Sequence, residues 1–91
     1  MREIEQTTAF KKDTKREGKG PNLGALNTVL PDILANLAAD IPLAAKYKDH
    51  TLTGNWAGCR DCHVRPDLIL IYEKTGNILI LHRLASHSEL F

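Results

Sequence analysis

The chain has 91 residues, the size of one small domain, and 43% of them are hydrophobic. Twelve lysines and arginines face eleven aspartates and glutamates, so the net charge of +1 gives no global basic field of the kind typical of nucleic-acid binders. No apolar run approaches the roughly 20 residues that span a bilayer, and the first residues lack the apolar region of a signal peptide. We therefore expect a single cytoplasmic domain over residues 1–91, with no membrane partner.

The beginning of the chain predicts a strand and then a helix. Residues 2–7 are mixed in character and are typical of a short edge strand with Ile4 directed inward. Thr8 is typical of a helix N-cap, and the helix that follows is anchored by Phe10 and ends at the glycines of the segment GKG. Residues 10–20 hold five basic residues against two acidic ones, which predicts a basic, solvated helix face.

The next segment predicts helical structure followed by a long loop. Between Asn22 and Leu37, leucines and isoleucines recur at three- and four-residue intervals, the pattern of an amphipathic helix that faces a core. The stripe consists of Leu23, Leu26, Leu30, Ile33 and Leu37. Pro31 interrupts it, so we expect either a kink or a second helix that starts at Pro31. Residues 40–56 show no sustained period and predict a connecting loop, of a length that is often functional.

Three strand candidates then follow in close succession, at residues 58–64, 68–72 and 78–84. The separators RPD and KTGN have turn chemistry, which makes the group an antiparallel meander. The strand LILIY is apolar throughout and is expected at the centre of the sheet. The fold class is therefore α+β, with two N-terminal helices packed on a small antiparallel sheet in the order β-α-α-β-β-β.

The segment GCRDCH (residues 58–63) matches C-x-x-C-H, the pattern of c-type haem attachment and the first half of many zinc sites. Strand alternation places Cys59 and Cys62 on opposite faces, and a cytoplasmic compartment argues against haem. No second cysteine pair exists, although His82 and His87 stand at the outer limit of zinc spacing. We interpret the cysteines as small strand residues and His82 as structural, and we expect no metal and no cofactor. A small metalloprotein built on the cysteines and histidines is an alternative.

The same strand leaves Asp61 and His63 on one face, and Asp67, Arg83 and His87 follow near the ends of the predicted sheet. Two histidines can divide the work of general base and general acid at neutral pH, while an arginine can hold a phosphate. Such a set suits a metal-free ribonuclease in which the 2'-hydroxyl of the RNA attacks the scissile phosphate. Taken alone, spacing establishes only a small α+β domain with a polar site.

Two segments carry a family resemblance, YKDHTLTGNWAGCRDCHVRPDLILIY (residues 47–72) and LHRLASHSELF (residues 81–91). They closely resemble the YafQ branch of the RelE-like toxins of bacterial toxin-antitoxin modules, strongly over residues 43–91 and in outline over the helical half. The resemblance implies a RelE-like fold and a ribosome-dependent mRNA endonuclease that cuts codons in the A site. It also implies a cognate antitoxin of ribbon-helix-helix type, the 70S ribosome and mRNA as partners, and operator DNA reached only through the antitoxin.

The resemblance also assigns roles to residues. The family's catalytic residues fall on His50, His63, Asp67 and His87, and its substrate-binding residues fall on Arg83 and Phe91, with Asp61 placed to support His63. By analogy His87 is the general acid on the leaving 5'-oxygen, Arg83 binds the phosphate, and Phe91 orients a base. Contacts to RNA or the ribosome are expected from Lys11, Lys12, Lys15, Arg16 and Lys48. The alternative is a catalytically weak module that acts with its antitoxin as a DNA-binding transcriptional corepressor.

Overall fold

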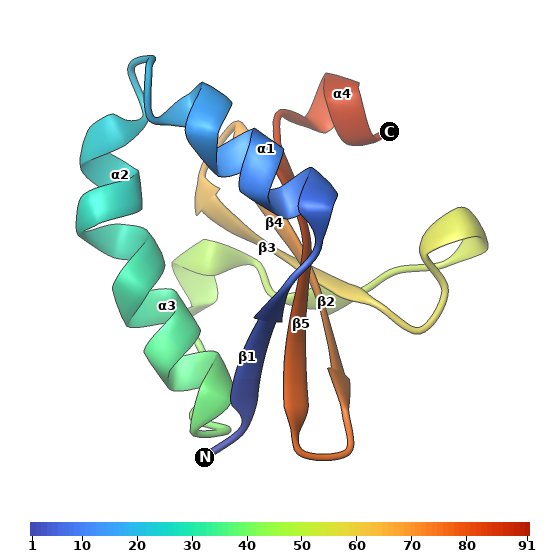
Figure 1. Ribbon diagram of the computed structural model, residues 1–91. Coiled ribbons are helices and arrows are strands. Elements are labelled where there is room, and N and C mark those ends of the chain that lie inside the picture. The colour runs from blue at the N-terminus through green and yellow to red at the C-terminus, as the bar shows by residue number, and fades with distance from the viewer.

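A computed structural model describes all of residues 1–91 and shows one sheet flanked by helices (Figure 1). The strands are β1 (Glu3–Gln6), β2 (His50–Thr51), β3 (Arg60–Arg65), β4 (Leu68–Thr75) and β5 (Ile78–Ala85). The helices are α1 (Thr8–Glu17), α2 (Leu23–Asn27), α3 (Val29–Ala38) and α4 (His87–Leu90), with short 3-10 turns η1 (Ala45–Tyr47) and η2 (Gly54–Trp56). None of the helices combines the length and the apolar character that a membrane crossing requires.

The sheet has the order β1-β5-β4-β3-β2. β3, β4 and β5 form the predicted antiparallel meander, and the apolar strand β4 lies at its centre with residues 68–72 all buried. β1 pairs with β5 in parallel, and it is an edge strand as expected. The expected inward direction of Ile4 is wrong, because all four residues of β1 are exposed and Ile4 itself is 44% exposed.

Helix α1 begins one residue before the position expected. The hydroxyl of Thr7, not Thr8, accepts a hydrogen bond from the backbone N–H of Phe10 at 3.0 Å and caps the helix. Phe10 is 2% exposed, which confirms it as the anchor of this helix. The C-cap is Gly18, at the first of the expected glycines.

The second helical segment breaks at Thr28, three residues before the expected position. Pro31 instead lies in the first turn of α3, where its missing N–H removes no intrahelical hydrogen bond, so proline is accommodated there. The helical stripe is confirmed at its C-terminal end, because Leu30, Ile33 and Leu37 are buried. It is wrong at its first member, since Leu23 is 47% exposed.

The sheet has an apolar cluster on each face. The larger cluster joins residues of β3, β4 and β5 to α1, α2 and α3, and it includes Cys62. The smaller one consists of Cys59, Ile69 and Ile71, covered by Leu52, Trp56 and Leu90. Figure 1 shows the three N-terminal helices along one side of the sheet, with α4 and the segment around η2 (yellow) on the other side. The predicted alternation that separates the two cysteines is therefore confirmed.

Two segments without predicted structure form the cover of the smaller cluster. The expected loop over residues 40–56 contains η1, η2 and the two-residue strand β2. The segment after β5, for which the sequence predicted no element, contains helix α4, whose capping box joins Ser86 to Glu89. Each of these elements is about one period long or shorter, so no repeating pattern in the sequence reveals it.

Candidate active site

Pairing between β2 and β3 positions His50 directly opposite Asp61. The Nδ1 atom of His50 lies 2.7 Å from the carbonyl oxygen of Lys48 and 3.1 Å from Oδ1 of Asp61. A carbonyl oxygen only accepts hydrogen bonds, so Nδ1 carries the proton in this arrangement. The Nε2 atom of the neutral ring then has a free lone pair, which is the form that a general base requires.

Asp61 is a buried carboxylate at the centre of this site. It is 2% exposed, and its Oδ1 accepts no hydrogen bond, because the Nδ1 proton of His50 is directed to the Lys48 carbonyl. Burial raises the pKa of Asp61 above its ordinary 3.8, while the charges of His50 and His63 and, to a lesser extent, His87 act in the opposite direction. All three histidines assigned by the resemblance therefore lie within electrostatic reach of one carboxylate.

The turn between β3 and β4 supports the helix that carries His87. Asp67 follows this turn's proline, and its Oδ1 accepts a hydrogen bond of 3.2 Å from the backbone N–H of His87. His87 is the first residue of α4 and is exposed, and its ring lies 5.1 Å from the ring of Phe91. The exposed ring of Phe91 and the imidazole thus form one surface beside Asp67. These three assigned residues are brought together by a single short helix.

Arg83 is fixed by a buried aspartate that sequence analysis missed. Asp13 on α1 is 2% exposed and accepts hydrogen bonds from Nε (2.7 Å) and Nη2 (3.2 Å) of Arg83, from Arg16 (3.0 Å) and from the backbone N–H of Leu84 (2.9 Å). Burial alone would raise the pKa of Asp13, but the bonds from Arg83 and Leu84 outweigh it and lower the pKa below 3.8. The Nη1 group of Arg83 has no protein partner and is free to bind a phosphate.

A second missed aspartate holds the segment before His50. Oδ1 of Asp49 accepts a hydrogen bond of 2.5 Å from the hydroxyl of Tyr72 and one of 3.2 Å from Nε of Arg60. Tyr72 is 1% exposed, and its burial, together with Asp49, raises the pKa of its hydroxyl. Asp49 thereby ties the loop that carries His50 to the central strand. The only sequence signal for this role is its place between Lys48 and His50.

Comparison with known proteins identifies the family. The profile described as "Bacterial toxin of type II toxin-antitoxin system, YafQ" matches residues 2–91. The chain belongs to the YafQ family. The Escherichia coli K12 protein "mRNA interferase toxin YafQ" is 38% identical over 92 residues, which cover all of this chain and 97% of that protein.

Solved bacterial toxin structures share the fold. A metal-bound toxin from Helicobacter pylori is 46% identical with a TM-score of 0.87, and each chain is covered completely. The YafQ chain of the E. coli DinJ-YafQ complex is 39% identical with a TM-score of 0.82, over 100% of this chain and 99% of that one. The fold class and the family resemblance expected from the sequence are confirmed.

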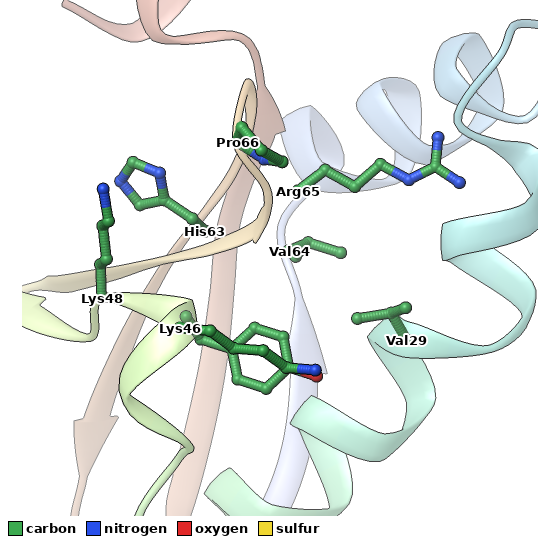
Figure 2. A pocket seen from close by; sticks show the side chains of 8 residues that line it. Val29, Lys46, Lys48, His63, Val64, Arg65 and Pro66 are labelled. Carbon is green, nitrogen blue, oxygen red and sulfur yellow. The ribbon is translucent and has the colours of Figure 1, made fainter.

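In this YafQ-family chain a basic pocket of about 400 Å³ adjoins the histidine site (Figure 2). It is lined by Val29, Lys46, Tyr47, Lys48, His63, Val64, Arg65 and Pro66. Figure 2 shows the side chains of Lys48 and His63 next to each other, while Arg65 extends away from them. Nη1 of Arg65 donates hydrogen bonds of 3.2 Å to the carbonyl of Pro21 and to Asn22, so it spans to the turn before α2. The sequence predicted Lys48 as an RNA or ribosome contact. It did not indicate Lys46 or Arg65, because no motif distinguishes their charges from those of other surface residues.

The lysines of α1 are exposed and make no polar contact with the proposed active-site residues. No hydrogen bond or ion pair joins Lys11, Lys12 or Lys15 to them. Arg16 differs from them, because it bonds Asp13 and the carbonyl of Leu84 (3.2 Å) and lies 3.7 Å from Glu89 of α4. Arg16 is thus part of the hydrogen-bonded group around Asp13 and Arg83. The three lysines remain predicted contacts to RNA or the ribosome.

Proposed function

We propose that this YafQ-family toxin is a ribosome-dependent mRNA interferase that cleaves mRNA codons in the A site without a metal ion. The observation that carries the proposal is the buried Asp61 carboxylate within electrostatic reach of three histidines, with a free arginine Nη1 group at the end of β5. Acid-base groups and a cationic phosphate site are the complete set that RNA transesterification requires. The name of the E. coli relative supports the same activity.

In the proposed reaction, Nε2 of His50 takes the proton of the 2'-hydroxyl, whose oxygen then bonds to the adjacent phosphorus. The bond from phosphorus to the 5'-oxygen breaks, and His87 gives its proton to that leaving oxygen. The products are a 2',3'-cyclic phosphate and a 5'-hydroxyl, so no water is consumed in this step. Asp61 stabilises the positive charge that His50 acquires, while His63 and Arg83 position the phosphate.

Phe91, Asp67 and the basic pocket complete the proposed substrate site. Phe91 offers an exposed ring on which a base can stack, next to the proposed acid His87. Asp67 holds the backbone of His87 in place. Lys48, which lines the basic pocket, and the exposed lysines of α1 contact RNA or ribosome phosphates.

We also propose that a cognate antitoxin of ribbon-helix-helix type neutralises the chain, and that operator DNA is bound only through that antitoxin. The support is the E. coli DinJ-YafQ complex, whose YafQ chain has the same fold as this one. The weak net charge of +1 also fits a toxin that lacks its own DNA-binding surface.

The test is cleavage of mRNA by the purified chain with 70S ribosomes, read by primer extension, together with growth on induction in bacteria. The wild type is expected to arrest growth and cut mRNA, and His87→Gln to cut about 100- to 10,000-fold more slowly. Ser88→Ala, on the same turn of α4, is the matched control and is expected to remain toxic. A harmless wild type that raises the operator affinity of its antitoxin would favour the corepressor alternative instead.

A further inference from the structure

We propose that Cys59, Glu73 and His82 form a binding site for a zinc-like divalent cation, separate from the acid-base residues. The thiol sulfur of Cys59, a carboxylate oxygen of Glu73 and a ring nitrogen of His82 all lie within 4.8 Å of one another. Sulfur, imidazole nitrogen and carboxylate oxygen are the three ligand types that zinc prefers in proteins. The spacing of the three residues in the chain matches no metal motif, so the sequence predicts only a strand residue at Cys59 and a structural role for His82.

The distances suit a tetrahedral ion after small side-chain movements. Oε1 of Glu73 lies 2.9 Å from Nε2 of His82 and 4.0 Å from Sγ of Cys59. Ligand atoms around tetrahedral zinc lie about 3.4 to 3.6 Å apart, given bonds of about 2.0 to 2.3 Å. The first pair therefore needs to open and the second to close by about half an ångström. The sulfur of Cys59 and the ring nitrogen of His82, which lie within 4.8 Å of each other, need to close by up to about 1.2 Å. On binding, the Cys59 thiol releases its proton to solvent and His82 binds as a neutral ring.

The backbone holds the three side chains in place from three neighbouring segments. Cys59 directly precedes β3, where its N–H donates to the carbonyl of Trp56 at 2.9 Å. Glu73 belongs to the central strand β4. His82 is the extra residue of a β-bulge in β5, because Ile71 pairs with Arg83 while the next residue of β4 pairs with Leu81. Bulges re-aim side chains and are frequent beside functional sites.

The surroundings leave one coordination position open to solvent. Cys59 is 8% exposed, whereas the side chains of His82 and Glu73 are 25% and 33% exposed, so the ion would be reached from their side. The ring of Trp56 packs edge-on against His82, with 6.1 Å between ring centroids. Three protein ligands with an open fourth position are typical of an exchangeable zinc site. Bound metal would tie the η2 segment to β4 and β5 and so stabilise the face that carries Asp61 and His63.

Cobalt(II) gives a direct test, because only a thiolate ligand produces a sulfur-to-cobalt charge-transfer band. Titration of the metal-free full chain with Co²⁺ is expected to give this band at one ion per chain and to quench the fluorescence of Trp56, the only tryptophan. Zn²⁺ is expected to displace Co²⁺ and to raise the melting temperature. Cys59→Ala is expected to abolish the band, and Glu73→Gln or His82→Gln to weaken binding by about 100-fold or more.

The matched control is Cys62→Ala, which removes the other cysteine from the opposite face and is expected to keep the band. Circular dichroism and melting without metal establish that each variant is folded. The half-buried, isosteric Glu73→Gln keeps the test valid if Cys59→Ala does not fold. The proposal is overturned if no stoichiometric ion binds, or if the band depends on Cys62. The proposal is also overturned if Co²⁺ binds without giving the band and this binding is lost in His63→Gln, because the ion would then occupy the histidine site. Cleavage of mRNA by the metal-free chain is a separate measurement. It tests the proposed nuclease activity whether or not the metal site exists.

Discussion

The substitution Asp61→Asn distinguishes the effect of this buried carboxylate on the stability of the fold from its effect on mRNA cleavage. Asp61 and Asp13 are each only 2% exposed, but their surroundings are opposite. Asp13 accepts four hydrogen bonds from protein donors, whereas Oδ1 of Asp61 accepts none. Asparagine is nearly isosteric with aspartate and carries no charge. Asp61→Asn therefore removes a charge whose Oδ1 accepts no hydrogen bond, whereas Asp13→Asn removes the charge from a fully hydrogen-bonded ion pair.

The expected effects on stability at pH 7 have opposite signs. An unsatisfied buried polar group costs about 1 to 3 kcal/mol, and more when it is charged than when it is neutral. Asparagine keeps a polar group at this position but removes the charge, so we expect Asp61→Asn to stabilise the fold by about 1 kcal/mol. For a domain of this size that corresponds to a rise of about 4 to 8 °C in melting temperature. Removing one partner from a buried ion pair costs about 3 to 5 kcal/mol, so Asp13→Asn is expected to lower the melting temperature well beyond that range.

The dependence on pH distinguishes the two carboxylates further. Burial raises the pKa of Asp61, so its contribution to stability is complete below pH 3.8 and is lost as pH rises through the raised pKa. The gain from Asp61→Asn should thus be small at pH 4 and full at pH 7. The pKa of Asp13 is lowered, so its contribution is present above pH 3.8 and is lost as pH falls through its folded value. The loss in Asp13→Asn should shrink in acid.

Urea denaturation between pH 3.5 and pH 8, with mRNA cleavage measured on the same samples, tests both carboxylates. Asp61→Asn is expected to be more stable than the wild type at pH 7 and yet to cleave at least about 10-fold more slowly, because the charge that stabilises the protonated base is gone. A variant at position 61 that is as unstable at pH 7 as Asp13→Asn would refute this reasoning, since it would show that the folded chain already compensates the Asp61 charge.

Three further predictions follow from single contacts. Thr7→Ala should cost about 1 kcal/mol in urea denaturation through loss of the N-cap of α1, while Thr8→Ala changes stability by less than about 0.5 kcal/mol; equal losses would show that the helix starts elsewhere. Tyr72→Phe should cost about 1 to 3 kcal/mol and slow cleavage, because Asp49 loses its 2.5 Å hydrogen bond beside His50; unchanged cleavage would show that this bond does not position the histidine. Lys46→Ala should weaken RNA binding for all sequences alike and reduce the salt slope by about 1, measured by fluorescence anisotropy; an unchanged slope would exclude a phosphate contact there.

The sequence predicted the elements whose residues repeat with a clear period. The five consecutive apolar residues of β4 and the turns that bound it were enough to place a central strand in a meander. Helix α1 was placed to within one residue. Thr7 and Thr8 are the same residue type, and only the contacts of the Thr7 hydroxyl, with the Phe10 N–H and with the His82 carbonyl, distinguish them. The sequence predicted the helix break at Pro31, because proline is costly inside a helix. The break is at Thr28, because proline is tolerated in the first turn of a helix.

Most of the site depends on contacts between residues that are distant in the chain. Arg83 and Asp13 are 70 residues apart. His50 reaches Asp61 only because the two-residue strand β2, which contains His50, pairs with β3. The family motif located Arg83 and the three histidines, but it did not indicate which groups hold them. Aspartates that act as structural anchors look the same in the sequence as exposed ones, so Asp13 and Asp49 gave no signal.

The bulge in β5 also has a consequence for insertions and deletions. Leu79, Leu81 and Leu84 all face the helix-side core, although the interval from the second to the third is one residue longer than strand alternation allows. If position 82 were deleted, the remaining residues would alternate regularly and every core leucine would keep its side of the sheet. The side chain at position 82 is therefore not needed to fill the core, and substitutions there are expected to leave the packing of these leucines unchanged.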